Sequence, residues 1–317
     1  MCIGTVVAPL GLILASFATE LWHIYLSQGI LFGIGAAFVF STSITLPSQW
    51  FVKYRAFATG IAVSGSGVGG VALSPMSQNL IDTVGYRNAL RAMGGMGFGI
   101  LCIATALAFS RWKPPGDRFV IIDRSLINFH FCILLLFGLI VPFGYVAPFF
   151  LTPTYAAYIN VDASRGATLV SVMSAMNAVC RIVLGFLADY IGRLNTMFIF
   201  TLIAGIFCMV IWQFATSYGS FVAYAVLYGL TGGGFVSLFP VVTADIVGVA
   251  NIQRGLGMCY LATTVGNLLG TPIAGLLQKH FGWTAAIQFA GAPSVTAALV
   301  ILVLRQIRSR GKIFMKI

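Results

Sequence analysis

Long apolar segments recur along the whole chain, and this recurrence limits the fold more than any other feature of the sequence. Lipid cannot bond to backbone N–H and C=O groups, so a segment that crosses a bilayer satisfies them internally, as a helix of about 20 mainly apolar residues. A β-barrel would instead show short segments of alternating polarity. The sequence therefore predicts an all-α membrane protein with ten spanning helices, at Cys2–Thr19, Trp22–Leu46, Ala56–Ile81, Asn88–Phe109, Leu126–Leu151, Thr168–Tyr190, Thr196–Phe214, Phe221–Ile246, Gly255–Leu277 and Trp283–Leu304.

The composition supports this interpretation and argues against a nucleic-acid partner. Hydrophobic residues make up 59% of the 317 residues and charged residues only 8%, which is far from a soluble globular protein. The excess of 18 Lys and Arg over 7 Asp and Glu would suit nucleic acid. However, these basic residues fall in a few short polar breaks and form no long basic face. We therefore expect the lipid bilayer, and not nucleic acid, as the partner.

The basic residues also predict how the chain is oriented. Cytoplasmic loops of membrane proteins are enriched in Lys and Arg. If both termini are cytoplasmic, four basic residues lie on the outer side: Arg87, Arg91, Arg165 and Lys279. Thirteen then lie on the cytoplasmic side: Lys53, Arg55, Arg111, Lys113, Arg118, Arg124, Arg193, Arg254, Arg305, Arg308, Arg310, Lys312 and Lys316. The bias predicts an even number of spans with both ends inside.

The longest polar break, Ser110–Arg124, predicts the domain organisation. It contains two consecutive prolines and several charges, which are typical of a linker. We expect an incomplete N-terminal bundle of four helices at 1–110, a cytoplasmic linker at 111–125, a C-terminal six-helix bundle at 126–304, and a basic cytoplasmic tail at 305–317. Two helical bundles joined by a linker are typical of secondary transporters.

The residues that usually carry chemistry are scattered. The six cysteines lie singly in apolar segments and the three histidines lie apart, so we expect no metal site and no cofactor. No segment offers paired carboxylates or a Ser-His arrangement, which disfavours an enzyme. Rings of charge and filter-like loops, which would indicate a channel, are also missing from the sequence.

Many of the 36 glycines recur at helical spacing, for example at Gly60 and Gly67. Small residues at this spacing let helices approach closely in a membrane. Close packing is therefore the first interpretation of these glycines, and flexibility for alternating access is compatible with it.

One charge falls in the middle of a predicted span, and charges there are costly and usually functional. Arg181 lies near the centre of Thr168–Tyr190, and Asn177 precedes it by one helical turn on the same face. A guanidinium can bind a carboxylate with two hydrogen bonds, so the pair predicts a binding site for an organic anion, with Asn177 orienting it. A structural arginine bound to helix-end carbonyls is the alternative.

The run Gly185-Phe186-Leu187-Ala188-Asp189-Tyr190-Ile191-Gly192-Arg193 resembles a cytoplasmic loop of the major facilitator superfamily, G-x-x-x-D-x-x-G-R. The resemblance implies that Asp189 and Arg193 brace neighbouring helix ends when the inner side is closed, with Gly192 between them. It also implies a fold of twelve helices in two bundles.

The stretch from Trp50 to Ser66 is similar to a loop and helix of the monocarboxylate transporter family, and Lys53 and Arg55 match its basic positions. Gly270-Thr271-Pro272-Ile273-Ala274-Gly275 resembles that family's eleventh helix. The sequence as a whole is similar to the fungal branch of the family, which includes riboflavin transporters and exporters of secondary metabolites. Gly232–Gly234 stand where the animal members carry bulky residues, which implies room for a larger substrate. The resemblance implies secondary transport or symport of a carboxylate-like small molecule, at the plasma membrane or at an internal membrane.

Two departures from this family are visible. The first predicted span corresponds to the family's third helix, so we expect that the first two helices are absent. A truncated, non-transporting remnant or a sensor of the same fold is therefore the alternative function. The animal members carry an Asp four residues before the matching Arg, whereas this chain has Asn177. Because Asn takes up no proton, the substitution argues against the proton coupling of those members.

Overall fold

The computed structural model describes residues 1–109, 123–310 and 315–316. Within these ranges every regular element is a helix, which confirms the predicted all-α class. Most of the predicted linker 111–125 lies outside the described residues, as do its basic residues Arg111, Lys113 and Arg118, and Lys312 in the predicted tail. The first three residues of that tail that carry charge, Arg305, Arg308 and Arg310, lie in or directly after the last helix.

The described chain forms two compact units. The first consists of Met1–Trp50 and Gly69–Lys113, and the second of Phe51–Val68 and Pro114–Ile317. The second unit therefore includes a helical segment that precedes the linker in sequence. The division at residue 110 stays a prediction about the chain's covalent organisation, whereas these units follow spatial contacts.

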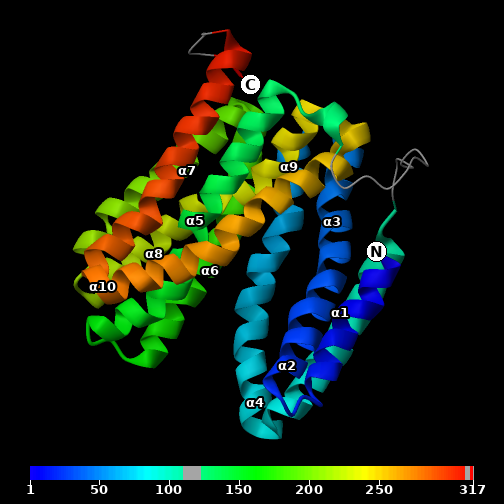
Figure 1. Ribbon diagram of the computed structural model, residues 1–317, viewed down its shortest axis with the longest axis vertical. Coiled ribbons are helices and arrows are strands. Elements are labelled where there is room, and N and C mark those ends of the chain that lie inside the picture. The colour runs from blue at the N-terminus through cyan, green and yellow to red at the C-terminus, as the bar shows by residue number, and fades with distance from the viewer. Residues whose placement is uncertain (110–122, 311–314, 317) are drawn as a thin grey trace. The chain divides into compact units, whose positions relative to one another are not determined.

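The first unit is built from α1 (Cys2–Ala15), α2 (Leu21–Ile24), the π-helix η1 (Tyr25–Leu31), α3 (Phe32–Trp50) and the later part of α4 (Arg55–Leu107). Figure 1 shows α1 beside α3. A side-chain carbon at Gly35 would lie 2.3 Å from the backbone nitrogen of Ala8, so only glycine allows this contact. On its other side, α1 is held to α4 by the Thr5 and Thr105 hydroxyls, which lie 2.7 Å apart.

The second unit contains the start of α4 and α5 (Phe129–Tyr158), α6 (Ala163–Ile191), α7 (Arg193–Val210), α8 (Tyr218–Gly232), α9 (Gly234–Val247) and α10 (Ile252–Ser309). Short 3-10 helices lie at Arg124–Leu126 (η2), Trp212–Phe214 (η3) and Val249–Asn251 (η4). The predicted span Phe221–Ile246 is thus divided into α8 and α9, which meet at Gly233. Figure 1 shows α5 against α10.

Eight helices of the described residues are long and apolar enough to cross a membrane. One of them, Val249–Ser309, has 61 residues, which at about 1.5 Å per residue is far longer than a bilayer is thick. It bends at Gly282, whose φ of +83° favours glycine, so it forms the two predicted spans Gly255–Leu277 and Trp283–Leu304. Gly85, with φ +77°, divides α4 in the same way. Together with the shorter apolar helix Cys2–Ala15, these elements are the ten predicted segments.

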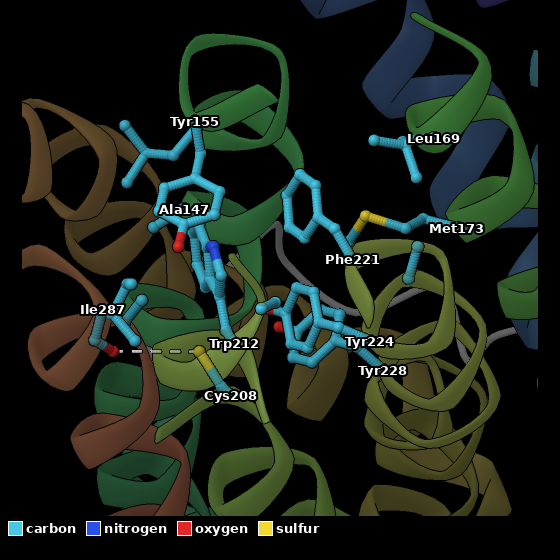
Figure 2. Packing of buried hydrophobic residues seen from close by; sticks show 14 of the residues in the cluster. Ala147, Tyr155, Leu169, Met173, Cys208, Trp212, Phe221, Tyr224, Tyr228 and Ile287 are labelled. Atoms are coloured by element: carbon cyan, nitrogen blue, oxygen red, sulfur yellow. Dashed lines mark hydrogen bonds between the residues drawn. The ribbon is translucent and has the colours of Figure 1, made fainter. Parts of the chain in front are cut away.

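Aromatic residues fill one part of the core of the second unit (Figure 2). The Trp212 ring stacks on the Tyr224 ring at 5.2 Å and meets the Tyr155 ring edge-on at 5.7 Å. The Cys208 thiol is fully buried beside them. Such large, interlocked rings favour a rigid scaffold for the polar residues of the same unit.

Candidate functional site

Arg181 lies in the middle of α6 and is only 7% exposed. Its Nη1 donates to the backbone oxygen of Val63 at 2.9 Å and to the Ser66 hydroxyl. Its Nη2 donates to the Tyr145 hydroxyl at 3.3 Å. The guanidinium is therefore held between the first part of α4 and α5, and all three of its partners are neutral oxygens.

No carboxylate of the described residues forms an ion pair with this guanidinium. Among the described residues, ion pairs join Arg55, Arg193 and Arg254 to carboxylates, and Arg181 is in none of them. Its Nε is buried and has no hydrogen-bond partner within the described part of the chain. The bond to the Val63 carbonyl agrees in part with the structural alternative, but neutral acceptors do not balance a buried charge. The arrangement attracts an anion.

Asn177 is 3% exposed and lies one turn before Arg181, as predicted. Its Oδ1 accepts a hydrogen bond from the Tyr145 hydroxyl at 3.5 Å. Its Nδ2 is buried and, in the described structure, has no acceptor. Asn177 Nδ2 and Arg181 Nε are thus two buried donors without acceptors in one region of the unit, and such donors are costly until a partner arrives.

Tyr145 was not predicted as a site residue, and neither was Ser66. The Tyr145 hydroxyl accepts from Arg181 and donates to Asn177, so it links the two predicted residues. Its ring meets the ring of Phe235 edge-on at 4.8 Å. Tyr145 is half-buried and Ser66 is exposed, so the polar group is accessible from one side of the unit. The only sequence signal was a hydroxyl within an otherwise apolar segment.

Glycines explain how α6 and the first part of α4 come so close. A side-chain carbon at Gly60 would lie 2.3 Å from the backbone oxygen of Arg181, and one at Gly185 would lie 2.6 Å from that of Ala56. The packing interpretation is confirmed for these positions. The prediction that Gly232–Gly234 leave room for substrate is wrong, because a side-chain carbon at Gly233 would lie 2.6 Å from Asn177 Nδ2.

A second polar cluster lies where several helices end. The carboxylate of Asp189, near the end of α6, accepts from the backbone N–H groups of Ala56 at 3.2 Å and Phe57 at 2.9 Å. These N–H groups belong to the first turn of α4 and have no partner within the helix. Asp189 therefore caps α4, and its negative charge is favourable at the positive end of that helix.

Two arginines and a second carboxylate complete this cluster. Arg193 Nη1 lies 2.7 and 2.8 Å from the two Asp245 oxygens, and Arg193 Nη2 lies 3.3 Å from Asp189. Arg55 Nη1 lies 3.0 Å from Asp245. We call these four residues the helix-end network. It joins the first residues of α4 and α7 to the last turns of α6 and α9, and its charges balance.

The structure brings most of the predicted loop residues into this network. Gly192, with φ +117°, separates α6 from α7 and so places Arg193 one turn beyond Asp189. Lys53 is not part of the network, since it is exposed and lies 5.4 Å from the centre of the Tyr54 ring. Asp245 was missed as a site residue, although an acidic residue near the end of an apolar segment was a usable signal in a chain with 7 acids.

A further ion pair joins the start of α10 to a residue outside the spanning helices. Arg254 Nη1, in the first turn of α10, lies 3.1 Å from Asp123, the first of the described residues 123–310. The pKa of the Asp123 carboxyl is lowered, first by bonds from the Ser125 hydroxyl and backbone N–H and then by Arg254. Asp123 is therefore ionised at neutral pH.

Comparison with known proteins places these features in a family context. The sequence profile described as Major Facilitator Superfamily matches residues 133–313. The "MFS-type transporter pynF" of Aspergillus niger is 32% identical to this chain over 96% of its length, and the match covers 71% of that protein. "Monocarboxylate transporter 12" of Xenopus laevis is 31% identical over 94% of this chain and 72% of that protein. These similarities agree with both resemblances found in the sequence.

The fold has solved counterparts. The fucose:proton symporter of Escherichia coli superposes with a TM-score of 0.73, covering 96% of this chain and 82% of that one. The two sequences are 15% identical, so the similarity concerns the fold alone.

Proposed function

This chain belongs to the major facilitator superfamily, and from that premise we propose that it carries an organic anion across the membrane, with Arg181 as the group that binds the anion. The chain is a multi-pass integral membrane protein and its relatives are transporters. Secondary transport moves a small molecule without changing it, so the protein is not an enzyme. The proposal concerns the chemical class of the substrate and the residues that hold it.

The observation that carries the proposal is the uncompensated charge of Arg181. A buried guanidinium with only neutral partners is stabilised by any anion that reaches it. A substrate carboxylate has lone pairs enough to accept from both Arg181 Nε and Asn177 Nδ2, the two buried donors that lack acceptors in the described structure. Carboxylate is also the group named in "Monocarboxylate transporter 12". A carboxylate-bearing metabolite, of monocarboxylate or larger size, therefore suits this site.

We assign a different role to the helix-end network. It consists of Arg55, Asp189, Arg193 and Asp245, and in it each charge faces an opposite one. Such a network holds four helix ends together and leaves no charge for a substrate. We propose that it stabilises one state of the alternating-access cycle and opens when the helices move apart. Lys53 and Gly192 belong to the loops beside it, and Gly192 sets its spacing.

Transport by purified protein tests the anchor. We would measure uptake of labelled monocarboxylates and larger carboxylates into proteoliposomes, comparing wild type with Arg181→Ala. Loss of the buried charge should reduce uptake about 100-fold or more, as when one partner of a buried charge contact is removed. Arg165→Ala is the matched control, because Arg165 lies exposed on the same helix, 5.5 Å from the Tyr218 ring.

Equal, saturable uptake by wild type and Arg181→Ala would refute the anchor role. The sensor alternative makes a different prediction, since a sensor of the same fold binds the anion but does not move it. Binding without uptake in wild type, measured by titration of the purified protein, would favour the sensor. We further propose the plasma membrane as the location, and a fluorescent fusion found only on internal membranes would contradict this.

A further inference from the structure

A groove lies between the start of α7 and the end of α10, and its described lining includes no residue of the two polar clusters described above. Its volume is about 790 Å³. One part of its wall is apolar and the other is polar. The apolar part consists of Ile191, Phe198, Ile199 and Leu302, and the polar part includes Asn195, Arg305, Gln306 and Lys316. A groove with these two parts suits an amphipathic molecule.

The polar part has a fixed geometry. Arg305 is 7% exposed, and its Nε donates to Asn195 Oδ1 at 2.5 Å. Asn195 Nδ2 in turn donates to the backbone oxygens of Ile191 at 3.0 Å and Met315 at 2.9 Å. The backbone near Met315 is thereby held over the groove. A buried, oriented arginine is better organised for binding than a mobile surface lysine.

The charge of the groove is positive. Its described lining residues include the cations Arg305 and Lys316, and none of these described residues is a carboxylate. Arg308 and Arg310 follow on the same helix end. The carboxylates of the helix-end network, Asp189 and Asp245, have arginine partners of their own. The cations would therefore attract an anionic group in the groove, and none of the described lining residues would repel it.

From these observations we propose that the groove binds an anionic phospholipid. Its phosphate would lie at Arg305 and Lys316, and an acyl chain would lie along Phe198, Ile199 and Leu302. Basic pockets between spanning helices on the cytoplasmic side attract anionic headgroups. The predicted orientation places this end of α10 in the cytoplasmic leaflet. The apolar wall distinguishes a lipid from a free phosphate, which would use only the polar part.

Native mass spectrometry of the full chain, released from vesicles, tests the proposal. The vesicles contain phosphatidylcholine and phosphatidylserine with identical acyl chains. We expect wild type to retain phosphatidylserine in preference to phosphatidylcholine. Each cation near an anionic headgroup contributes about 1 kcal/mol, so Arg305→Gln and Lys316→Gln should each reduce this preference by about fivefold. Lys279→Gln, which removes an exposed charge far along α10, should leave the preference unchanged.

Two results would overturn the proposal. One is equal retention of the two lipids by wild type. The other is a preference that persists in the double variant Arg305→Gln/Lys316→Gln. Since Arg305 is buried, Lys316→Gln provides a variant at an exposed position that does not threaten folding, and thermal unfolding checks both. If glycerophosphoserine, which has no acyl chain, binds as tightly as the whole lipid, the groove is a phosphate site and the lipid assignment is wrong.

Discussion

Helix α6 carries two charged regions that differ in one respect, the balance of their charges. In its middle, Arg181 has neutral oxygens as partners, and no carboxylate among the described residues compensates its positive charge. About two turns later, Asp189 enters a network of two carboxylates and two arginines. In a balanced network each charge has an opposite charge within the protein, whereas an unbalanced buried charge is stabilised by an ion that binds to the protein. The comparison thus separates a structural region from the region that we propose binds the anion, here called the binding region, on a single helix.

Replacing Arg181 with methionine should have the largest effect, because it removes the unpaired charge that distinguishes the two regions. Methionine has similar length and no charge, so the substitution removes the attraction for an anion and also the cost of burying the guanidinium. We expect uptake to fall about 100-fold or more, with a free energy of unfolding that is unchanged or higher. Uptake and thermal unfolding of the same preparation measure both effects. A large loss of stability would show that Arg181 is mainly structural.

Asp245→Asn should show the opposite pattern. The variant keeps the shape of the side chain but leaves Arg55 and Arg193 facing each other without their shared carboxylate. We expect a loss of about 2 kcal/mol in the free energy of unfolding, below the full value for a buried pair because Asp245 is 24% exposed. Anion affinity at Arg181 should not change in a direct binding titration. Asp162→Asn, at an exposed position that makes no side-chain cap, is the matched control.

Asn177→Asp should make the binding region resemble the balanced one. An ionised Asp beside Arg181 would neutralise the guanidinium and compete with the substrate. We expect uptake at neutral pH to fall about tenfold, the cost of roughly 1.4 kcal/mol of lost attraction, and to recover as acid protonates the new carboxyl. Uptake measured across pH detects this dependence. Asn177→Ser is the control, because it removes the amide without adding a titratable group, and a similar pH profile in that variant would contradict the explanation.

Tyr145→Phe should have a smaller effect, since it removes one hydroxyl and no charge. The hydroxyl joins Arg181 to Asn177, and its loss frees both side chains to shift. One hydrogen bond contributes about 1 kcal/mol, so we expect about fivefold weaker anion affinity with intact folding. Isothermal titration measures the change. Tyr158→Phe, which removes an exposed hydroxyl from the same helix, should leave the affinity unchanged, and an equal loss there would rule out a specific role for Tyr145.

The sequence predicted the fold and those residues of the candidate site that lie close together in the chain. It did not predict the contacts between residues that lie far apart in the chain. The length of the apolar segments located all ten helical segments, because the membrane requires each span to be apolar over its own length. Arg181 and Asn177 could be paired because they are one turn apart. Ser66 and Tyr145, in contrast, reach Arg181 across 115 and 36 positions, and Asp245 meets Arg55 across 190. No local pattern predicts such contacts, nor which of the neighbouring cations Lys53 and Arg55 joins a network.

The pair of Asp123 and Arg254 should give the smallest effect, and it extends the comparison to a carboxylate outside the spanning helices. The folded protein lowers the pKa of Asp123 below its ordinary value of 3.8. A lowered pKa means that the ionised carboxylate stabilises the folded state, so this contribution is complete above that ordinary value and is lost as pH falls through the folded pKa. Wild type should therefore lose slightly more thermal stability than Asp123→Asn between about pH 5 and pH 3. If the two proteins lose stability in parallel, the pair of Asp123 and Arg254 does not contribute to folding. Paired charges would then stabilise the protein only where they are more buried, as in the helix-end network.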